Sequence, residues 1–255
     1  MNVLVCVKRV PAPGAKINIT DDGQAVDAAH LGFTTSPHEE CALEEAVQIT
    51  ERDGGEVTVL TLGPIEAEEQ LRYAASVGAH NIILIPTNGA AWDPQRTATA
   101  LANAITQAEA SNGEAFELIL FGNESADSGG FQVGVRVAHK LGRPIVNAIK
   151  GIEPGDQSIT AKREIDGGFE VYELPTPAVL GVKEGLNLPR YPTMKGRLAS
   201  KKVELETNEI DAPAGGQTLV TLHRPPEQAS TTEVLGTDES AAVAVVDILE
   251  EIGLV

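Results

Sequence analysis

Short runs of Val, Ile and Leu alternate with longer segments of helical period along the first half of the chain, and this alternation limits the possible folds most strongly. The apolar runs predict buried strands at residues 3–7, 57–62, 81–85 and 118–121. Apolar residues spaced three and four apart predict helices between them, at 39–52, 65–77 and 93–110. Because strands that alternate with helices need parallel crossovers, we expect an α/β fold with a doubly wound, mostly parallel, Rossmann-like sheet.

The pattern changes after Leu141. Residues 158–163 and 168–173 predict a β-hairpin that turns at 165–168, because Asp-Gly in that turn is a strong hairpin signal. Residues 178–182 predict another buried strand. We interpret the hairpin as an insertion into the α/β domain.

The last third of the chain carries weaker signals. Residues 184–196 combine Gly, Asn and Pro with Leu and Tyr, and predict a long loop that a compact domain does not need for its own stability. Residues 207–240 are rich in Thr, Pro, Gly and Ser and predict an extended segment, whereas 241–252 predict an amphipathic helix. We therefore expect an α/β domain over residues 1–232 and a C-terminal arm over residues 233–255.

Composition narrows the class of protein. No apolar stretch is long enough to span a membrane, and the N-terminus enters a strand-like run without a cleavable leader, which predicts a cytoplasmic protein. The 37 acidic and 19 basic residues give a formal charge of −18, which argues against nucleic acid or an anionic membrane as the main partner. Cys6 and Cys41 lie in apolar patterns and are expected to be buried free thiols.

One strand-loop-helix unit carries the features of a phosphate site. The strand at 118–121 ends at a glycine, a loop of small residues follows, and the helical pattern runs from Phe131 to Leu141. A helix start offers unpaired N–H groups and a positive dipole end, so it can hold a phosphate without a basic side chain. A plain structural turn is the alternative. The candidate residues are Gly122, Asn123, Glu124, Ser125, Ala126, Asp127, Ser128, Gly129, Gly130, Phe131, Gln132 and Val133.

Three further segments complete a candidate cleft at the ends of the strands. Cys6 to Lys8 end the first strand, and Leu62 ends the second. Ser36-Pro37-His38-Glu39 has a hydroxyl cap, a proline at the first helical position and a glutamate three residues after the cap, which together predict a capping box. A plain helix cap is the alternative interpretation of Ser36.

Catalytic motifs are missing from the sequence. The five histidines show no metal-ligand spacing, and neither Cys-x-x-Cys nor His-Glu-x-x-His occurs. A Gly-x-Ser-x-Gly elbow, a Walker loop and a Gly-x-Gly-x-x-Gly after the first strand are missing as well. The cleft is therefore predicted to bind a nucleotide, with no catalytic residues and no metal.

Four motifs make the chain recognisable. They are Val-Cys-Val-Lys-Arg-Val-Pro at 5–11, Gly-Asn-Glu-Ser-Ala-Asp-Ser-Gly-Gly at 122–130, Arg-Glu-Ile-Asp-Gly-Gly at 163–168 followed by Leu-Pro-Thr-Pro-Ala-Val at 174–179, and Asn-Leu-Pro-Arg-Tyr-Pro-Thr-Met-Lys-Gly at 187–196. Together, and in this order, they resemble the β subunits of electron-transfer flavoproteins. The resemblance covers nearly the whole chain.

The resemblance implies an electron carrier, not an enzyme. It implies a heterodimer in which an α subunit holds most of the redox-active FAD. The β subunit carries AMP in its own cleft, so its Rossmann-like fold is expected to bind an adenine nucleotide. Electrons arrive from acyl-CoA or related dehydrogenases, as in fatty acid β-oxidation, and leave to a membrane quinone reductase. By motif, the AMP contacts fall on Cys6, Ser36, Pro37, His38, Glu39, Leu62 and the loop 122–133, with the phosphate near the amides of Gly129 to Gln132.

The resemblance also assigns two docking regions. The loop 184–196 matches the family's recognition loop for dehydrogenases, with Met194 at the place of its apolar anchor, and the expected docking residues are Leu188, Arg190, Tyr191, Met194 and Lys195. A methionine folded back on the domain is the alternative. Glu164 falls where the family has an acidic residue facing the α subunit near the flavin; a solvated hairpin charge is its alternative.

Several alternatives concern the cleft. Phe131 stands where some relatives have a polar residue, so the phosphate is expected to depend more on backbone amides. Some bacterial relatives bind a second FAD in place of AMP and bifurcate electrons, and the nucleotide stays open between the two. Ser128-Gly129-Gly130 resembles the start of the pyrophosphatase loop Ser-Gly-Gly-x-Asp-Ser, which suggests a stand-alone adenine-nucleotide enzyme or sensor. This loop, however, continues without the Asp-Ser of that motif. A purely structural subunit with an empty cleft is the last alternative.

Overall fold

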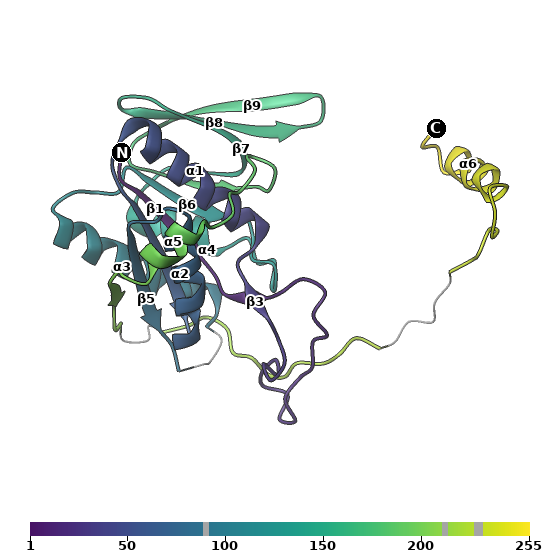
Figure 1. Ribbon diagram of the computed structural model, residues 1–255, viewed down its shortest axis with the longest axis horizontal. Coiled ribbons are helices and arrows are strands. Elements are labelled where there is room, and N and C mark those ends of the chain that lie inside the picture. The colour runs from purple at the N-terminus through teal and green to yellow at the C-terminus, as the bar shows by residue number, and fades with distance from the viewer. Residues whose placement is uncertain (89–91, 211–213, 227–231) are drawn as a thin grey trace. The chain divides into compact units, whose positions relative to one another are not determined.

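The computed structural model describes residues 1–88, 92–210, 214–226 and 232–255 (Figure 1). The chain divides into two compact units, Met1–Leu222 and His223–Val255. The boundary expected from the sequence lies later, after residue 232. Parts of the expected extended segment, 211–213 and 227–231, lie outside the described residues.

The first unit is built on one large sheet. Its strands, among the described residues, are β1 (Val3–Val7), β4 (Val57–Gly63), β5 (Asn81–Pro86), β6 (Leu118–Gly122), β7 (Ile145–Pro154), β8 (Ser158–Ile165), β9 (Gly168–Pro175), β10 (Ala178–Val182) and β11 (Leu205–Thr207). Their spatial order is β11-β5-β4-β1-β6-β10-β7-β8-β9. Neighbours are parallel from β11 to β7, and the hairpin β8-β9 adds antiparallel strands at one edge. The predicted mostly parallel α/β fold is confirmed.

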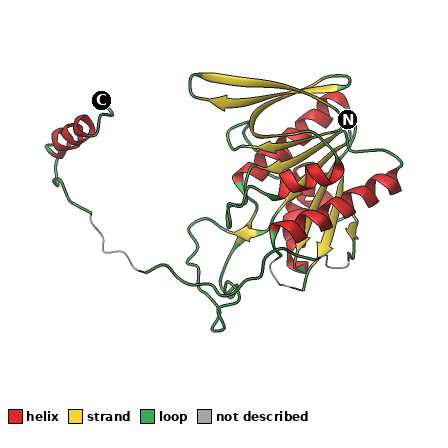
Figure 2. Cartoon of the chain, turned by 180° about the vertical axis from the view of Figure 1, so that it is seen from behind, coloured by secondary structure: helices red, strands yellow, loops and turns green. Residues whose placement is uncertain are grey.

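Helices cover both faces of this sheet (Figures 1 and 2). They are α1 (Pro37–Asp53), α2 (Glu68–Val77) after the short 3-10 turn η1 (Ile65–Ala67), α3 (Pro94–Asn112), α4 (Val133–Leu141) and α5 (Met194–Ser200). Successive side chains of a strand point to opposite faces, and β1 follows this rule. Val3, Val5 and Val7 pack with α1 and α2, whereas Leu4 and Cys6 pack with α3 and α4. Both faces of β1 are therefore buried, as in other parallel sheets.

The predicted strands and crossover helices are confirmed to within a few residues. One boundary is wrong, because α4 begins at Val133 and Phe131 precedes it with a left-handed backbone, φ +53°. Among the described elements, β7, β11 and α5 have no counterpart among the predictions, and neither do the two short strands at 10–11 and 33–34. The loop expected at 184–196 ends in the first turn of α5, where the Thr193 hydroxyl accepts a hydrogen bond from the Gly196 N–H at 3.0 Å.

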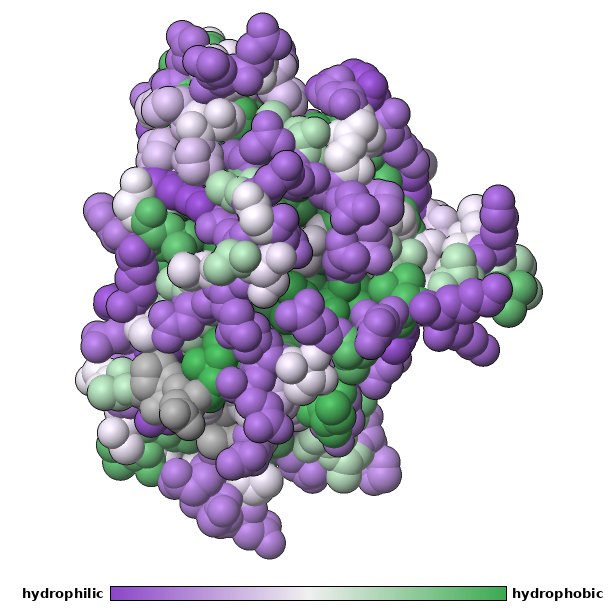
Figure 3. All heavy atoms as spheres, turned by 90° about the vertical axis from the view of Figure 1, so that its left-hand side faces the viewer, coloured by the Kyte–Doolittle hydropathy of each residue, from purple (hydrophilic) through white to green (hydrophobic). Residues whose placement is uncertain are grey.

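In the part of the chain that is described, two short strands lie outside the large sheet. β2 (Val10–Pro11) and β3 (Phe33–Thr34) form a separate antiparallel pair after β1. Both cysteines are free and buried, as predicted. Hydrophilic residues cover most of the face shown in Figure 3, with apolar residues in smaller groups.

The second unit contains one helix, α6 (Ala241–Glu251), among its described residues. The predicted apolar side of this helix includes Val243 and Val246, and both are exposed. No residue of α6 is buried. The helix therefore presents apolar side chains that its own unit does not cover.

Candidate nucleotide-binding site

The candidate cleft lies where the order of strands reverses. From β1 the chain crosses through α1 to β4 on one side, and from β6 it crosses through α4 to β7 on the other. β1 and β6 are direct neighbours, with Cys6 opposite Phe121. In open α/β sheets ligands bind beyond the carboxyl ends of strands at such a switch point. Lys8 and Gly122 stand at these two ends.

Glu39 connects the end of β1 with the start of α1. Its carboxylate accepts hydrogen bonds from the backbone N–H of Lys8 at 3.0 Å and from that of Ser36 at 2.9 Å. The Ser36 hydroxyl in turn accepts from the Glu39 N–H at 3.2 Å, and Pro37 is the first helical residue. The predicted capping box is confirmed, and it also fixes the turn that leaves β1.

Burial controls the protonation of this region. Glu39 is only 6% exposed, and burial raises the pKa of its carboxyl to about 8, against the backbone donors and Lys8, which favour the ionised form. Burial, assisted by the charge of Glu39, raises the pKa of the Cys6 thiol. Cys6 therefore stays a neutral thiol that packs beneath the site and is not a nucleophile.

Gly122 allows the end of β6 to approach the start of α1. A Cβ atom on Gly122 would lie 2.8 Å from Cγ of Glu39 and 3.2 Å from Cβ of His38. Real Cβ atoms do not approach other atoms at the shorter distance, so only glycine fits while these neighbours keep their places. The close contact places the capping box beside the first residue of the predicted phosphate loop.

An ion pair joins the loop to β1. The Lys8 ammonium donates to both carboxylate oxygens of Asp127, at 2.7 and 2.6 Å, and the Ser128 N–H donates to the same carboxylate at 2.8 Å. Burial opposes ionisation of Asp127, but these contacts outweigh it and lower its pKa. Sequence reasoning included Lys8 only as the end of a strand, because no local pattern links it to Asp127, 119 positions away.

His38 contacts both the loop 122–133 and the segment that follows β10. Its Nδ1 accepts a hydrogen bond from the Glu184 N–H at 2.7 Å, so the proton of a neutral ring lies on Nε2, which faces Glu124 at 3.2 Å. Asn123 accepts from the Ala148 N–H at 2.9 Å through its side-chain oxygen. The first half of the loop is thus fixed by side-chain contacts on both sides.

The second half of the loop leads into α4 with an exposed backbone. Gly129 has φ +53°, as does Phe131, which is exposed; a left-handed conformation is strained for an aromatic residue. Gln132 stands at the N-cap of α4, but its side chain binds Arg136 at 3.0 and 3.2 Å and forms no cap hydrogen bond. In the described part of the chain, α4 therefore begins without a side-chain cap.

The predicted site residues fall into two groups in space. Cys6, the capping box 36–39 and the loop 122–133 meet at the carboxyl ends of β1 and β6, and Leu62 lies at the end of the neighbouring strand β4. Ala126 and Gly130 are exposed in the loop. Among the residues that the structure describes, no group of His, Cys, Asp or Glu could hold a metal ion.

The predicted docking residues from Leu188 to Lys195 lie on a loop that is bound to α1 and on the first turn of α5, whereas Glu164 lies on β8. Leu188, Tyr191 and Met194 are 89%, 90% and 77% exposed, and Lys195 is exposed beside Met194. Arg190, in contrast, forms ion pairs with Glu44 and Glu51 of α1.

Comparison with known proteins defines the class further. The fold is that of a doubly wound, Rossmann-like α/β protein, and the electron transfer flavoprotein domain matches residues 25–213. The chain is 35% identical to electron transfer flavoprotein subunit beta of Syntrophomonas wolfei, over 92% of this chain and 90% of that protein. It is 34% identical to the subunit beta of Mycobacterium tuberculosis H37Rv, over 93% of each chain, and 33% identical to that of Bacillus subtilis, over 83% and 80%. The chain belongs to the electron transfer flavoprotein family, among its beta subunits.

A helix that crosses a membrane must be both long and apolar. None of the helices in the described ranges is both long enough and apolar enough to cross a bilayer.

Replacing Gly122 by alanine tests the close contact at the end of β6. We expect Gly122→Ala to lower the free energy of unfolding by about 1–3 kcal/mol, because the new methyl group overlaps Glu39. Gly168→Ala is the matched control, since a Cβ there meets no atom within 4 Å. Urea denaturation measures both, and equal effects of the two substitutions would contradict the packing described.

The buried carboxyl of Glu39 predicts a pH dependence of stability. Its pKa is about 8 in the folded chain, against an ordinary value of 4.5, so between these values the folded chain keeps a proton that the unfolded chain releases. The free energy of unfolding must therefore fall as pH rises through this window, by on the order of 1 kcal/mol per pH unit. Glu39→Gln removes this contribution. Urea denaturation across the window should show wild type losing stability relative to the variant, and parallel profiles would rule the assignment out.

Proposed function

We propose that the chain is the β subunit of a heterodimeric electron-transfer flavoprotein in the cytoplasm, with AMP in its own cleft. It helps to hold an FAD that the α subunit binds for the most part. The FAD supplies the redox chemistry, and this chain makes and breaks no bonds. Electrons pass from acyl-CoA or related dehydrogenases, as in fatty acid β-oxidation, to a quinone reductase of the respiratory chain.

The observation that carries the proposal is the uncapped start of α4 at the switch point of the sheet. Phe131, with positive φ, is followed by the right-handed Gln132, and such pairs bring successive N–H groups to one side, where an anion binds. The positive end of the α4 dipole favours the same charge. The amides of Gly130, Phe131 and Gln132 would hold the phosphate of AMP, and Cys6 would pack near the rest of the nucleotide. The Gly129 N–H, which the motif also suggested, already donates to the Ser125 carbonyl at 3.0 Å.

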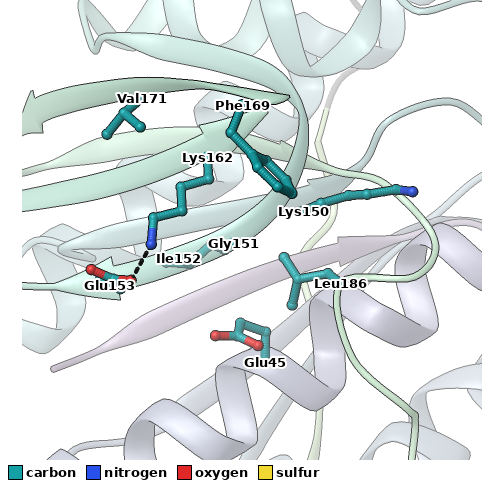
Figure 4. Close-up of a pocket in the computed structure, with 9 residues that line it drawn as sticks. All are labelled: Glu45, Lys150, Gly151, Ile152, Glu153, Lys162, Phe169, Val171 and Leu186. Carbon is teal, nitrogen blue, oxygen red and sulfur yellow. Dashed lines mark hydrogen bonds and ion pairs between the residues drawn. The ribbon is translucent and has the colours of Figure 1, made fainter. Parts of the chain in front are cut away.

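A groove beside the hairpin supports contact with an α subunit. It encloses about 550 Å³, and Phe169 and Leu186 face one another across it (Figure 4). Phe169 and Val171 are exposed, and Glu164 pairs with Lys150 at 2.5 Å near its rim. We propose that the α subunit covers this groove and the apolar side of α6. The lining residues are Glu45, Lys150, Gly151, Ile152, Glu153, Lys162, Phe169, Val171 and Leu186.

The nucleotide inventory of the purified heterodimer tests the proposal. The complex is denatured, and the released nucleotides are separated by chromatography and counted per heterodimer. We expect one FAD and one AMP. Two FAD molecules would select the electron-bifurcating alternative, and a complex without flavin would overturn both. Release of pyrophosphate from ATP by the chain alone would favour a stand-alone enzyme instead.

The exposed Met194 is proposed as the anchor that docks on a dehydrogenase. An unbranched, polarisable side chain suits a contact that must fit several partners. Truncation of a buried interface anchor costs about 2 kcal/mol, so Met194→Ala should raise KM for the dehydrogenase roughly 30-fold at unchanged FAD content. Val220→Ala, at another exposed apolar residue, serves as the control. Steady-state assays with a purified acyl-CoA dehydrogenase and octanoyl-CoA measure the effect, and an unchanged KM would refute the anchor.

A further inference from the structure

Arg190 lies in the middle of the predicted docking loop, but its guanidinium forms four hydrogen bonds within the chain. Nε and Nη2 donate to the Glu44 carboxylate at 2.8 and 3.1 Å, and Nη1 and Nη2 donate to the Glu51 carboxylate at 2.7 and 2.9 Å. The Arg190 N–H also donates to Glu44, at 3.1 Å. Glu44 and Glu51 are seven residues apart in α1, so they share one face of the helix two turns apart. One guanidinium thus joins the loop to two turns of α1.

Asn187 fixes the loop three residues earlier. Its side-chain amide donates to the Cys41 carbonyl at 3.0 Å and to the Glu45 carboxylate at 3.0 Å. The segment from Asn187 to Arg190 is therefore held to α1 at both ends. Leu188, between these two residues, is exposed.

The following part of the loop is held at its other end. Thr193 caps α5, and Gly196 lies so close to α2 that a Cβ on it would be 2.2 Å from the Ser76 carbonyl oxygen. Tyr191 and Met194 lie between the Arg190 contacts and this second contact. The exposed apolar side chains thus project from a segment fixed on both sides.

We propose that Arg190 is a positioning residue for partner docking: it does not contact the dehydrogenase but holds Leu188 and Tyr191 outward, as a preformed apolar projection for an apolar pocket. The inference rests on the proposed docking function of the loop. A preformed contact binds more tightly because the conformational cost has been met during folding. Arginine is required, since its planar fork donates to two carboxylates at once, whereas a lysine ammonium is a single point charge.

The test compares Arg190→Gln and Arg190→Lys with Arg52→Gln in the purified heterodimer. Arg52 lies on the same helix and pairs with its neighbour Asp53, so the control removes one positive charge without touching the loop. Hydrogen exchange of amides 187–196 measures how firmly the loop is held. Assays with an acyl-CoA dehydrogenase and octanoyl-CoA separate KM from kcat, and the flavin content is determined for each variant.

We expect exchange in the loop of Arg190→Gln to accelerate at least about tenfold and KM for the dehydrogenase to rise about tenfold, at unchanged kcat and flavin content. Arg190→Lys should recover part of both effects, and Arg52→Gln should show neither. Unchanged exchange in Arg190→Gln would overturn the proposal, whatever the kinetics.

Faster exchange with an unchanged KM would also overturn it, and Met194→Ala in the same assay then identifies which step fails. If Met194→Ala raises KM, the loop docks and Arg190 does not position it. If Met194→Ala has no effect either, the docking function itself is wrong. A fall in flavin content of Arg190→Gln would show that the residue supports the fold at large, which contradicts a positioning role.

Discussion

The buried carboxyl group of Glu39 holds the C-terminal ends of β1 and β6 in one arrangement. Glu39 accepts from the turn that leaves β1 and from the cap of α1, and its methylene lies where only a glycine lets β6 approach. A parallel sheet leaves a crevice at its switch point because the crossovers depart in opposite directions. Glu39 therefore fixes the segments that bound the proposed nucleotide site, which are the turn after β1, the start of α1 and the end of β6.

Helix α1 serves two sites that lie apart. Its first turn supplies the capping box of the cleft, whereas its middle and last turns supply Glu44 and Glu51 to the docking loop. The acidic composition of the chain thus has a local use, because two of these carboxylates hold a loop that exposes apolar side chains. One helix thus borders the proposed nucleotide site and also holds the loop proposed for docking, as we would expect of a subunit that positions a cofactor.

The elements that depend on residues close together in the sequence could be predicted from it. Continuous apolar runs identified β1, β4, β5 and β6, and the Ser36–Glu39 spacing identified the capping box. The sequence did not predict β11, a three-residue edge strand, or the start of α4, because the pattern of apolar residues does not reveal that Phe131 has a left-handed backbone. Arg190 looks like an exposed loop charge, because its partners lie 139 and 146 positions away. Contacts of this length come only from the folded topology.

We have proposed that backbone amides at the start of α4 hold the phosphate of an adenine nucleotide beyond β1 and β6. A crystal structure of the purified heterodimer measures this most directly. We expect density for an adenylate group at the carboxyl ends of these strands, with its phosphate against the amides of Gly130 to Gln132. A cleft filled by side chains, or a nucleotide bound elsewhere on the chain, would contradict it.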